Sequence, residues 1–311
     1  MVEVHEMTKR YGPFTAVNRI SFSIRTGEVV GFIGPNGAGK TSTMRVLTGF
    51  LPATEGRVLV AGHDVFEEPN QVKSKVGYLP ETPPLYTELT VGRYLNFAAE
   101  IRGVSRRNRL ARVGEVMEQV GLSGWEDRIL GSLSKGYRQR VGIAQALVHD
   151  PEVLILDEPT SGLDPVQTQG VRTLIENLAG DRTIVLSTHI LGEVEALCSR
   201  VILIDQGNIV VDGSLDSVRE AAGKQHYRLR VESSSGPFSD LGVIAADVGE
   251  LSTIRRVEPH GDGSLRVESE GENPCHELTR LAVDKGWHVL ELREHRPTLE
   301  EAFLNLVGKE L

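Results

Sequence analysis

The first part of the chain alternates short apolar runs with helical patterns, which is typical of a parallel sheet covered by helices. Residues 2–7 and 17–24 alternate apolar and polar positions, whereas 29–33 is apolar throughout. Two half-buried strands followed by a fully buried one predict a small antiparallel layer laid against a buried parallel sheet. Further strands are predicted at 57–62, 76–80, 153–156, 183–188 and 201–211, the last as a hairpin that turns at Gly207 and Asn208.

In the middle of the first part of the chain, the spacing of apolar residues changes from that of strands to that of helices. One helix is expected from Thr90 to Ile101 and another from Ser105 to Val120, with Ser105 in the N-cap position. A third begins at Ser134. We therefore expect a helical subdomain, at about residues 88–150, inserted between the strands of the sheet.

The turn after the strand at 29–33 has the spacing G-x-x-x-x-G-K-[ST] and leads directly into a helix. Glycines let the backbone wrap with its N–H groups pointing inward, and the helix N-terminus adds unpaired donors and a partial positive charge. Lys40 is expected to reach the β- and γ-phosphates of a nucleotide, and the Thr41 hydroxyl to bind Mg²⁺. A chance match in a glycine-rich turn is the alternative, and the flanking strand and helix argue against it. The predicted phosphate cradle consists of Gly34, Pro35, Asn36, Gly37, Ala38, Gly39, Lys40, Thr41 and Ser42.

Two later strands end in side chains that suit phosphate chemistry. The apolar run 153–156 is followed by Asp157 and Glu158, and a later strand ends at His189. Ligands gather at the carboxyl ends of parallel strands. Asp157 therefore suits the Mg²⁺ of the cradle, Glu158 a base or water-orienting group, and His189 a contact with the γ-phosphate. The alternative for the two carboxylates is a solvated pair after a strand.

Three further positions carry polar residues. Their place in the chain alone does not decide what they do. Ser134 begins a helix with Gly136 two residues on, which describes either a well-capped helix or a second phosphate-binding helix end. Tyr11 lies in the turn after the first strand and is either a packing residue or a ligand-binding one. Asp164 is expected to cap a helix that begins near Pro165.

Composition restricts the class of protein. A chain of 311 residues with 40% hydrophobic and 25% charged residues is typical of a soluble globular protein of two domains. The net charge of −9 argues against a general binder of nucleic acid or of anionic membranes. No apolar stretch approaches the ~18 residues of a membrane span, and the acidic residues 1–6 do not have the pattern of a signal peptide. Cys198 and Cys275 lie far apart without metal-ligand spacing, which indicates free thiols in the reducing cytoplasm.

Five motifs together resemble those of the ATP-binding subunits of ABC transporters, across about residues 1–220. They are the phosphate cradle, L-S-x-G-x-x-Q from Leu133, an apolar strand followed by D-E, S-G-L-D ending at Asp164, and a strand-ending histidine, in this order. The resemblance implies an α/β P-loop NTPase with a RecA-like core, an antiparallel β subdomain and a helical subdomain. It also implies that two chains close head-to-tail around two molecules of ATP.

The resemblance assigns roles to residues of the cradle and of the strand ends. Tyr11 looks like the aromatic residue that stacks on adenine. Lys40 and Thr41 would hold phosphate and Mg²⁺, with Asp157 assisting the metal as expected above. Glu158 would be the catalytic base and His189 the switch histidine.

The resemblance further implies that a second chain completes each site. The signature motif Leu133–Tyr137 carries Ser134 and Gly136, which would meet the γ-phosphate of ATP bound by the opposite chain. Asp164 would belong to the loop that crosses the interface between the two chains.

Three positions depart from the family pattern. Glu81 follows the Tyr-Leu-Pro strand where most of the family has Gln. A carboxylate still binds Mg²⁺ but cannot donate a hydrogen bond as an amide does, so the metal role stands and the water-positioning role is open. Lys135 and Tyr137 replace the commoner Gly and Gln of the signature. Lys135 either adds a positive charge near the partner's phosphates or is a solvated side chain.

Residues 223–311 lie outside this resemblance and follow the order β-α-β-β-α-β of a ferredoxin-like domain. The strands are predicted at 227–231, 254–257, 265–267 and 287–292, and the helices at 239–248, 275–283 and 299–307. The chain is thus expected to divide into an ATP-binding domain, 1–222, and an accessory domain, 223–311. Such a tail resembles that of bacterial exporter ATPases with a separate membrane subunit, as in drug export, polysaccharide export and gliding motility. Its role is either dimerisation or regulation, or else passive stabilisation.

The leading hypothesis is an ATPase subunit that energises export through a separate integral membrane permease, at the cytoplasmic face of the cell membrane. The loop 81–91 and the helices after it would contact the permease. The alternative is a soluble ABC-type ATPase acting on nucleic acid or ribosomes, but such relatives usually have a long coiled coil or two cassettes. A P-loop kinase or GTPase leaves the signature motif and His189 unexplained. We therefore expect ATP and Mg²⁺ as cofactors, a permease and a second copy as partners, and no nucleic acid.

Overall fold

The computed structural model describes residues 1–180, 182–222, 226–233, 236–237, 240–269, 274–295 and 298–307. The chain divides into two compact units, Met1–Leu215 and Asp216–Leu311, each with a hydrophobic core of its own. Helix α8 (Leu215–Ala222), which we expected at the end of the first domain, belongs to the second unit except for its first residue. The division at 222/223 therefore stays a prediction.

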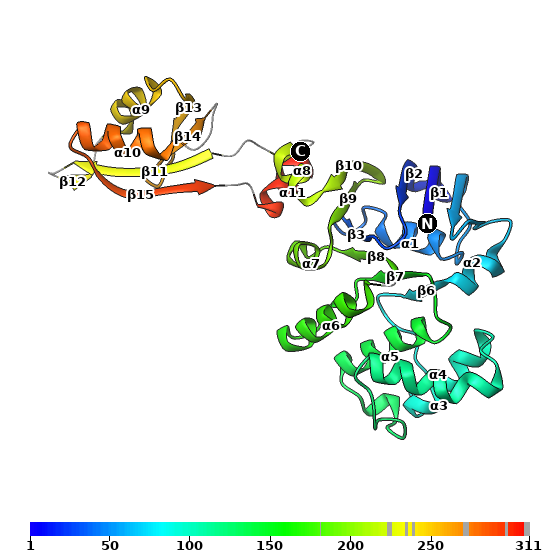
Figure 1. Ribbon diagram of the computed structural model, residues 1–311. Helices are drawn as coiled ribbons and strands as arrows, with labels where there is room; N and C mark the ends of the chain where they lie inside the picture. The colour runs from blue at the N-terminus through cyan, green and yellow to red at the C-terminus, as the bar shows by residue number, and fades with distance from the viewer. Residues whose placement is uncertain are drawn as a thin grey trace. The chain divides into compact units, whose positions relative to one another are not determined.

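The first unit is built on a six-stranded sheet in the order β10-β9-β3-β8-β7-β6 (Figure 1). Its strands are β3 (Val29–Ile33), β6 (Val76–Leu79), β7 (Val153–Asp157), β8 (Thr183–Thr188), β9 (Arg200–Asp205) and β10 (Asn208–Ser214). All neighbours are parallel except β10, which forms the expected hairpin with β9. Every residue of β7 and β8 is buried, as strands covered on both faces require. Because β3, β8 and β7 are adjacent, their carboxyl ends meet at one edge of the sheet.

A second, antiparallel sheet covers part of the first, as the alternating pattern predicted. Its order is β2-β1-β4-β5, with β1 (Val2–Tyr11), β2 (Phe14–Ile24), β4 (Glu55–Val60) and β5 (His63–Asp64). The two sheets share one core, in which the ring centroids of Phe22 and Phe32 lie 5.8 Å apart. Strand β5 and helix α2 (Pro69–Lys75) were not predicted, because β5 has two residues and α2 buries only Val72.

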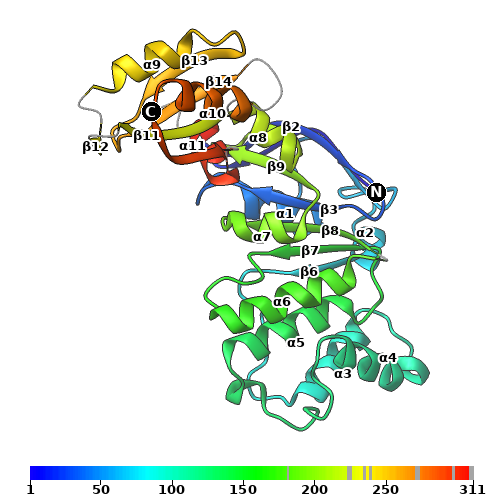
Figure 2. The same cartoon turned by 60° about the vertical axis from the view of Figure 1, so that its left-hand side comes forward.

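The remaining helices of this unit cover the parallel sheet or form the inserted helical subdomain. They are α1 (Lys40–Leu47), α3 (Val91–Ile101), α4 (Arg106–Gln119), α5 (Lys135–Leu147), α6 (Pro165–Leu178) and α7 (Leu191–Leu197), with a 3-10 turn at Leu130–Ser132. Figures 1 and 2 both place α3 and α4 beyond α5, away from β1 and β2. Ser105 occupies the N-cap of α4 but its side chain makes no capping hydrogen bond, whereas Thr90 caps α3 by accepting from the Arg93 N–H.

The second unit contains the expected ferredoxin-like arrangement. Its elements after α8 are β11 (His226–Ser233), β12 (Gly236–Pro237), α9 (Leu241–Gly249), β13 (Ile254–Pro259), β14 (Leu265–Ser269), α10 (Cys275–Asp284), β15 (His288–His295) and α11 (Leu299–Val307). The main strands pair in the order β15-β11-β14-β13, all antiparallel. Figure 1 shows α9 and α10 on one face of this sheet. The predicted helix at 239–248 starts at a residue outside the described ones.

Candidate nucleotide-binding site

The phosphate cradle joins β3 to α1, and two of its glycines are required by space and backbone conformation. A Cβ at Gly34 would collide with the carbonyl oxygen of Ile204. Gly39, the N-cap of α1, has φ 110°, which side chains disfavour, and a Cβ there would also meet the carbonyl oxygen of Ala16. The buried Lys40 ammonium donates to the carbonyl oxygens of Gly34 (2.8 Å) and Pro35 (3.2 Å). These hydrogen bonds hold the Lys40 side chain against the cradle, where it is expected to bind phosphate.

Asp157, at the end of β7, faces the start of α1. Its Oδ1 accepts hydrogen bonds from the Thr41 hydroxyl (3.4 Å) and, at closer range, from the Ser187 hydroxyl of β8. Its Oδ2 is buried and has no hydrogen-bond partner in the described structure. Burial raises the pKa of Asp157, the two hydroxyl hydrogen bonds oppose this, and the exposed Glu81 nearby raises it further. An orphaned carboxylate oxygen beside a hydroxyl and a second carboxylate fits a bound Mg²⁺.

Glu158 is the next residue, and its side chain lies between a lysine and a histidine. Lys40 Nζ lies 3.5 Å from Oε1, and His189 Nδ1 lies 2.8 Å from Oε2. The backbone of Glu158 has φ 49°, a conformation that costs about 1–3 kcal/mol and is concentrated at functional sites. Its N–H donates to the carbonyl oxygen of Ser187 (2.9 Å), which fixes this strained residue to β8. The structure thus brings together the three residues that the sequence analysis placed in catalytic roles.

Tyr11 lies close to the cradle at the end of β1. Its hydroxyl is 3.4 Å from the Ser42 hydroxyl, and Lys9 Nζ lies 5.2 Å from the ring centroid. Tyr11 is 41% exposed, so an aromatic residue next to the cradle is accessible from solvent.

The signature motif belongs to the helical subdomain and makes no hydrogen bond or ion pair with Lys40, Asp157, Glu158 or His189 among the described residues. Ser134 caps α5 by accepting from the Tyr137 N–H (3.5 Å). A Cβ at Gly136 would collide with Gln167 of α6. Asp164 caps α6 as predicted, accepting from the Gln167 N–H (2.8 Å).

The two residues of the motif that depart from the family pattern have neighbours within the chain. Tyr137 stacks on Trp125 with ring centroids 4.1 Å apart. The Lys135 ammonium lies so close to Gly162 that a side chain at that glycine would displace it.

Comparisons with known proteins show the family of the chain. The family described as ABC transporter matches residues 17–161, and the C-terminal domain of DrrA1-3-like ATP-binding proteins matches 213–307. The bacitracin transport ATP-binding protein BcrA of Bacillus licheniformis is 35% identical over 311 residues, covering 99% of this chain and 97% of that protein. The linearmycin resistance ATP-binding protein LnrL of Bacillus subtilis (strain 168) is 32% identical over 316 residues, covering 100% and 99%. A solved ATP-binding subunit of an ABC transporter superposes with a TM-score of 0.64 at 30% identity, covering 71% of this chain and 92% of that one.

The chain belongs to the ATP-binding proteins of ABC transporters. It is an ABC ATPase, and the family supports the transporter hypothesis over the alternative of an ATPase acting on nucleic acid or ribosomes. The dimeric cassette MJ0796, solved with ADP and Pi after hydrolysis, shares the fold with a TM-score of 0.63 at 24% identity. Among the residues described here, no helix of this ABC ATPase is long and apolar enough to cross a membrane.

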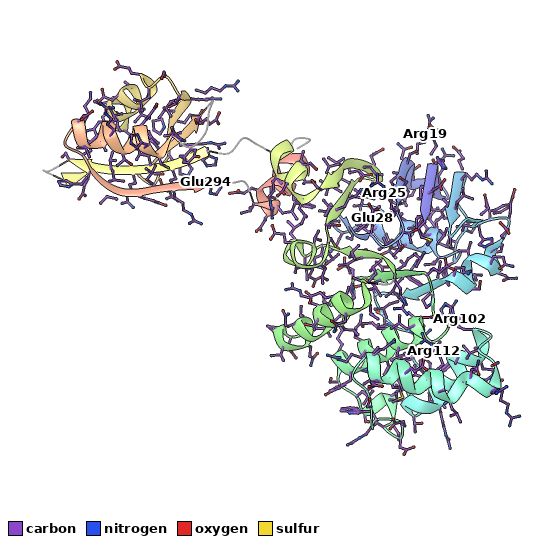
Figure 3. The ribbon with its side chains drawn as sticks, viewed as in Figure 1. Arg19, Arg25, Glu28, Arg102, Arg112 and Glu294 are labelled. Carbon is purple, nitrogen blue, oxygen red and sulfur yellow. The ribbon has the colours of Figure 1, made fainter. Side chains whose placement is uncertain are left out.

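The ABC ATPase also has two neighbouring cavities, of about 480 and 410 Å³, that together form a groove between the helical subdomain and the sheet. Ile101, Arg102 and Gln145 line both cavities. Arg102, labelled in Figure 3, donates to the carbonyl oxygen of Lys73 (2.8 Å), and burial lowers the pKa of its guanidinium. The aromatic residues Phe50, Tyr86 and Phe97 line the groove and are exposed.

Sequence reasoning missed Ser187, whose hydroxyl contacts Asp157. The available signal was a hydroxyl residue directly after the apolar run Ile184–Leu186 and ahead of Thr188 and His189. The groove was missed as well, because its walls come from segments far apart in the chain.

Proposed function

We propose that two copies of this ABC ATPase form two composite ATP sites, each completed by the signature motif of the other copy. The observation that carries the proposal is the separation of two half-sites within one chain. Lys40, Asp157, Glu158 and His189 form one cluster, whereas the capped N-terminus of α5 at Ser134 lies apart from it. The solved MJ0796 cassettes of the same fold include a dimer in the post-hydrolysis state.

Within each site the roles follow from the contacts. Lys40, already held over the cradle, would bind the β- and γ-phosphates, and the exposed Tyr11 ring would stack on adenine. Thr41, Asp157 and Glu81 would hold Mg²⁺, which takes one or two carboxylates from a protein and its other ligands from phosphates and water. When bound, Mg²⁺ neutralises charge that develops on the phosphates.

Glu158 is the proposed base for the attacking water. Its Oε2 faces His189, which would orient the carboxylate and contact the γ-phosphate, while Oε1 faces Lys40. Asp164, at the start of α6, would lie in the loop that crosses between the two copies.

We further propose that the groove receives a cytoplasmic segment of an integral membrane permease, so that the subunit works at the inner face of the cell membrane. The groove begins at the loop after β6, where Pro84, Leu85 and Tyr86 form one wall. Exposed aromatic residues that line one groove together with an arginine suit an amphipathic partner helix. BcrA is named for bacitracin transport and LnrL for linearmycin resistance, which favours export of an antibiotic-like compound.

Mixing two inactive variants tests the composite sites. Lys40→Ala and Ser134→Ala chains, each with little ATPase activity, should regain part of it when combined, because one mixed site then has both an intact Lys40 and an intact Ser134. Absence of any recovery, with both variants folded, contradicts completion by a second copy.

A further inference from the structure

Glu193, in the first turn of α7, is fully buried at 0% exposure. Each of its carboxylate oxygens receives one threonine hydroxyl. Thr188 donates to Oε2 at 2.9 Å, and Thr160 donates to Oε1 at closer range. Both threonines are themselves buried. Three polar side chains are thus joined in the interior of the ATP-binding unit.

Burying these three polar side chains costs more free energy than filling the same space with apolar side chains. Within the described residues, no lysine, arginine or histidine forms an ion pair with Glu193. A buried carboxylate that has only neutral donors loses more hydration free energy than a well-packed apolar side chain of similar size. Burial raises the pKa of the neighbouring Cys198 thiol to about 12, and the Glu193 carboxylate contributes to this shift. Glu193 is therefore expected to have a role beyond packing, and the segments to which the two threonines belong indicate that role.

Both threonines belong to segments that carry proposed catalytic residues. Thr160 lies two residues after Glu158, in a turn where the Ser161 N–H donates to the carbonyl oxygen of Glu158 (3.1 Å). Thr188 immediately precedes His189, and its hydroxyl accepts from the Ile190 N–H (3.0 Å). The Thr188 hydroxyl therefore links the residue before His189 to the backbone of the residue after it.

We infer that Glu193 is a positioning residue that sets the distance between Glu158 and His189. It joins the turn after β7, through Thr160, to the end of β8, through Thr188, while the facing atoms of Glu158 and His189 lie 2.8 Å apart. Within the described part of the chain, Glu193 forms no hydrogen bond or ion pair with either side chain, so we infer that it acts through Thr160 and Thr188. The inference rests on the proposed roles of Glu158 and His189.

Single-hydroxyl variants test this without emptying the interior. Thr188→Val and Thr160→Val keep side-chain shape and each remove one donor to Glu193, while Thr188→Val also removes the acceptor of the Ile190 N–H. We expect kcat for ATP hydrolysis to fall by about tenfold in each, because small misplacements of catalytic groups are costly, while KM for ATP and Kd for ADP stay within about twofold. Thr188→Ser and Thr160→Ser should restore kcat. Glu195→Gln, on the exposed side of the same helix, is the control and should leave kcat unchanged.

A second measurement separates positioning from general loosening of the fold. In a His189→Ala background, Thr188→Val should lower kcat no further, because its effect passes through the missing imidazole. A further tenfold loss there, or wild-type kcat in folded Thr160→Val and Thr188→Val chains, overturns the inference. If Glu158→Gln and His189→Ala themselves retain full activity, the proposed catalytic roles fail instead.

Discussion

The imidazole of His189 lies 2.8 Å from one carboxylate oxygen of Glu158, and the ammonium of Lys40 lies 3.5 Å from the other. These residues come from the end of β8, the end of β7 and the start of α1. Parallel pairing of β3 with β8 and of β8 with β7 brings the three together, with Asp157 directly opposite Ser187 in the register. Each oxygen of the Glu158 carboxylate therefore has one cationic or imidazole partner.

Replacing Glu158 by glutamine keeps the size of this side chain and removes its basicity. We expect Glu158→Gln to lower ATP hydrolysis by at least about 10²-fold, the usual contribution of a general base. ATP binding should persist, so an ATP-dependent dimer should accumulate and be visible by gel filtration. Unchanged hydrolysis would remove Glu158 as the base.

Local patterns in the sequence were enough to predict the strands of the six-stranded sheet, the cradle sequence and the strand-end carboxylates. A buried parallel strand needs apolar residues on both faces. β7 has them at every position before Asp157, and β8 has them at Ile184, Val185 and Leu186. The ferredoxin-like order of the second unit followed in the same way, from the order of its strands and helices.

Contacts between segments far apart in the chain could not be predicted from local patterns. The Glu193 carboxylate meets Thr160 across 33 residues, and nothing in the helical pattern of α7 indicates that this position is buried. For Ser105 the position was predicted correctly and the contact was not. It occupies the predicted N-cap, but its side chain makes no capping hydrogen bond. Side-chain direction depends on tertiary neighbours that one segment does not contain.

The orphaned oxygen of Asp157 predicts how Mg²⁺ affects stability. Asp157→Asn puts an amide group next to the Thr41 and Ser187 hydroxyls and removes the charge that attracts the metal. We expect ATP with EDTA to stabilise the variant as it does the native chain, while the additional rise in Tm on adding Mg²⁺ is lost. Glu152→Gln, at the other end of β7 and paired with Lys75, should keep the full Mg²⁺ effect. A normal Mg²⁺ effect in Asp157→Asn would exclude this residue as a ligand.

His149 predicts a loss of stability at acidic pH. Burial, assisted by Arg102, lowers the pKa of His149 from 6.5 to about 4, and its Nε2 lies 3.1 Å from the carbonyl oxygen of Val76. The native imidazole stays neutral between these values while the unfolded one takes up a proton. Stability is therefore present above pH 6.5 and falls as the pH drops toward 4, by at most about 3 kcal/mol at 1.36 kcal/mol per unit.

His149→Gln keeps an N–H donor for Val76 without titrating. Thermal unfolding at about pH 7.5 and about pH 5 should show a smaller drop in Tm for this variant than for the native chain. The exposed His260 provides the control, since His260→Gln should retain the native drop. An unaltered drop in His149→Gln would contradict the assignment.

The groove predicts where the permease binds. Ile101→Glu puts a carboxylate on the wall shared by the two cavities, at a residue 67% exposed in this chain. We expect basal ATP hydrolysis to change less than twofold and co-purification with the membrane subunit to fall by at least about tenfold, as loss of about 1.4 kcal/mol gives. Leu110→Glu, on α4 and 76% exposed, does not line either cavity and should behave as the native chain. Equal retention of the permease by both variants would place the contact elsewhere.

Removing residues 223–311 tests whether the accessory domain is needed to form the ATP site. One hydrophobic cluster of the first unit is made of residues up to Ile209, and one of the second unit is made of residues from Tyr227 to Leu292. These two described clusters share no residue. Lys40, Asp157, Glu158 and His189 make their described contacts within the first unit. We therefore expect the shortened chain to bind ATP with a Kd within about threefold of the full chain, a difference under about 1 kcal/mol. Loss of binding in a folded product would show that the division at 222/223 is wrong, whereas normal binding with reduced dimer formation would assign the accessory domain to assembly.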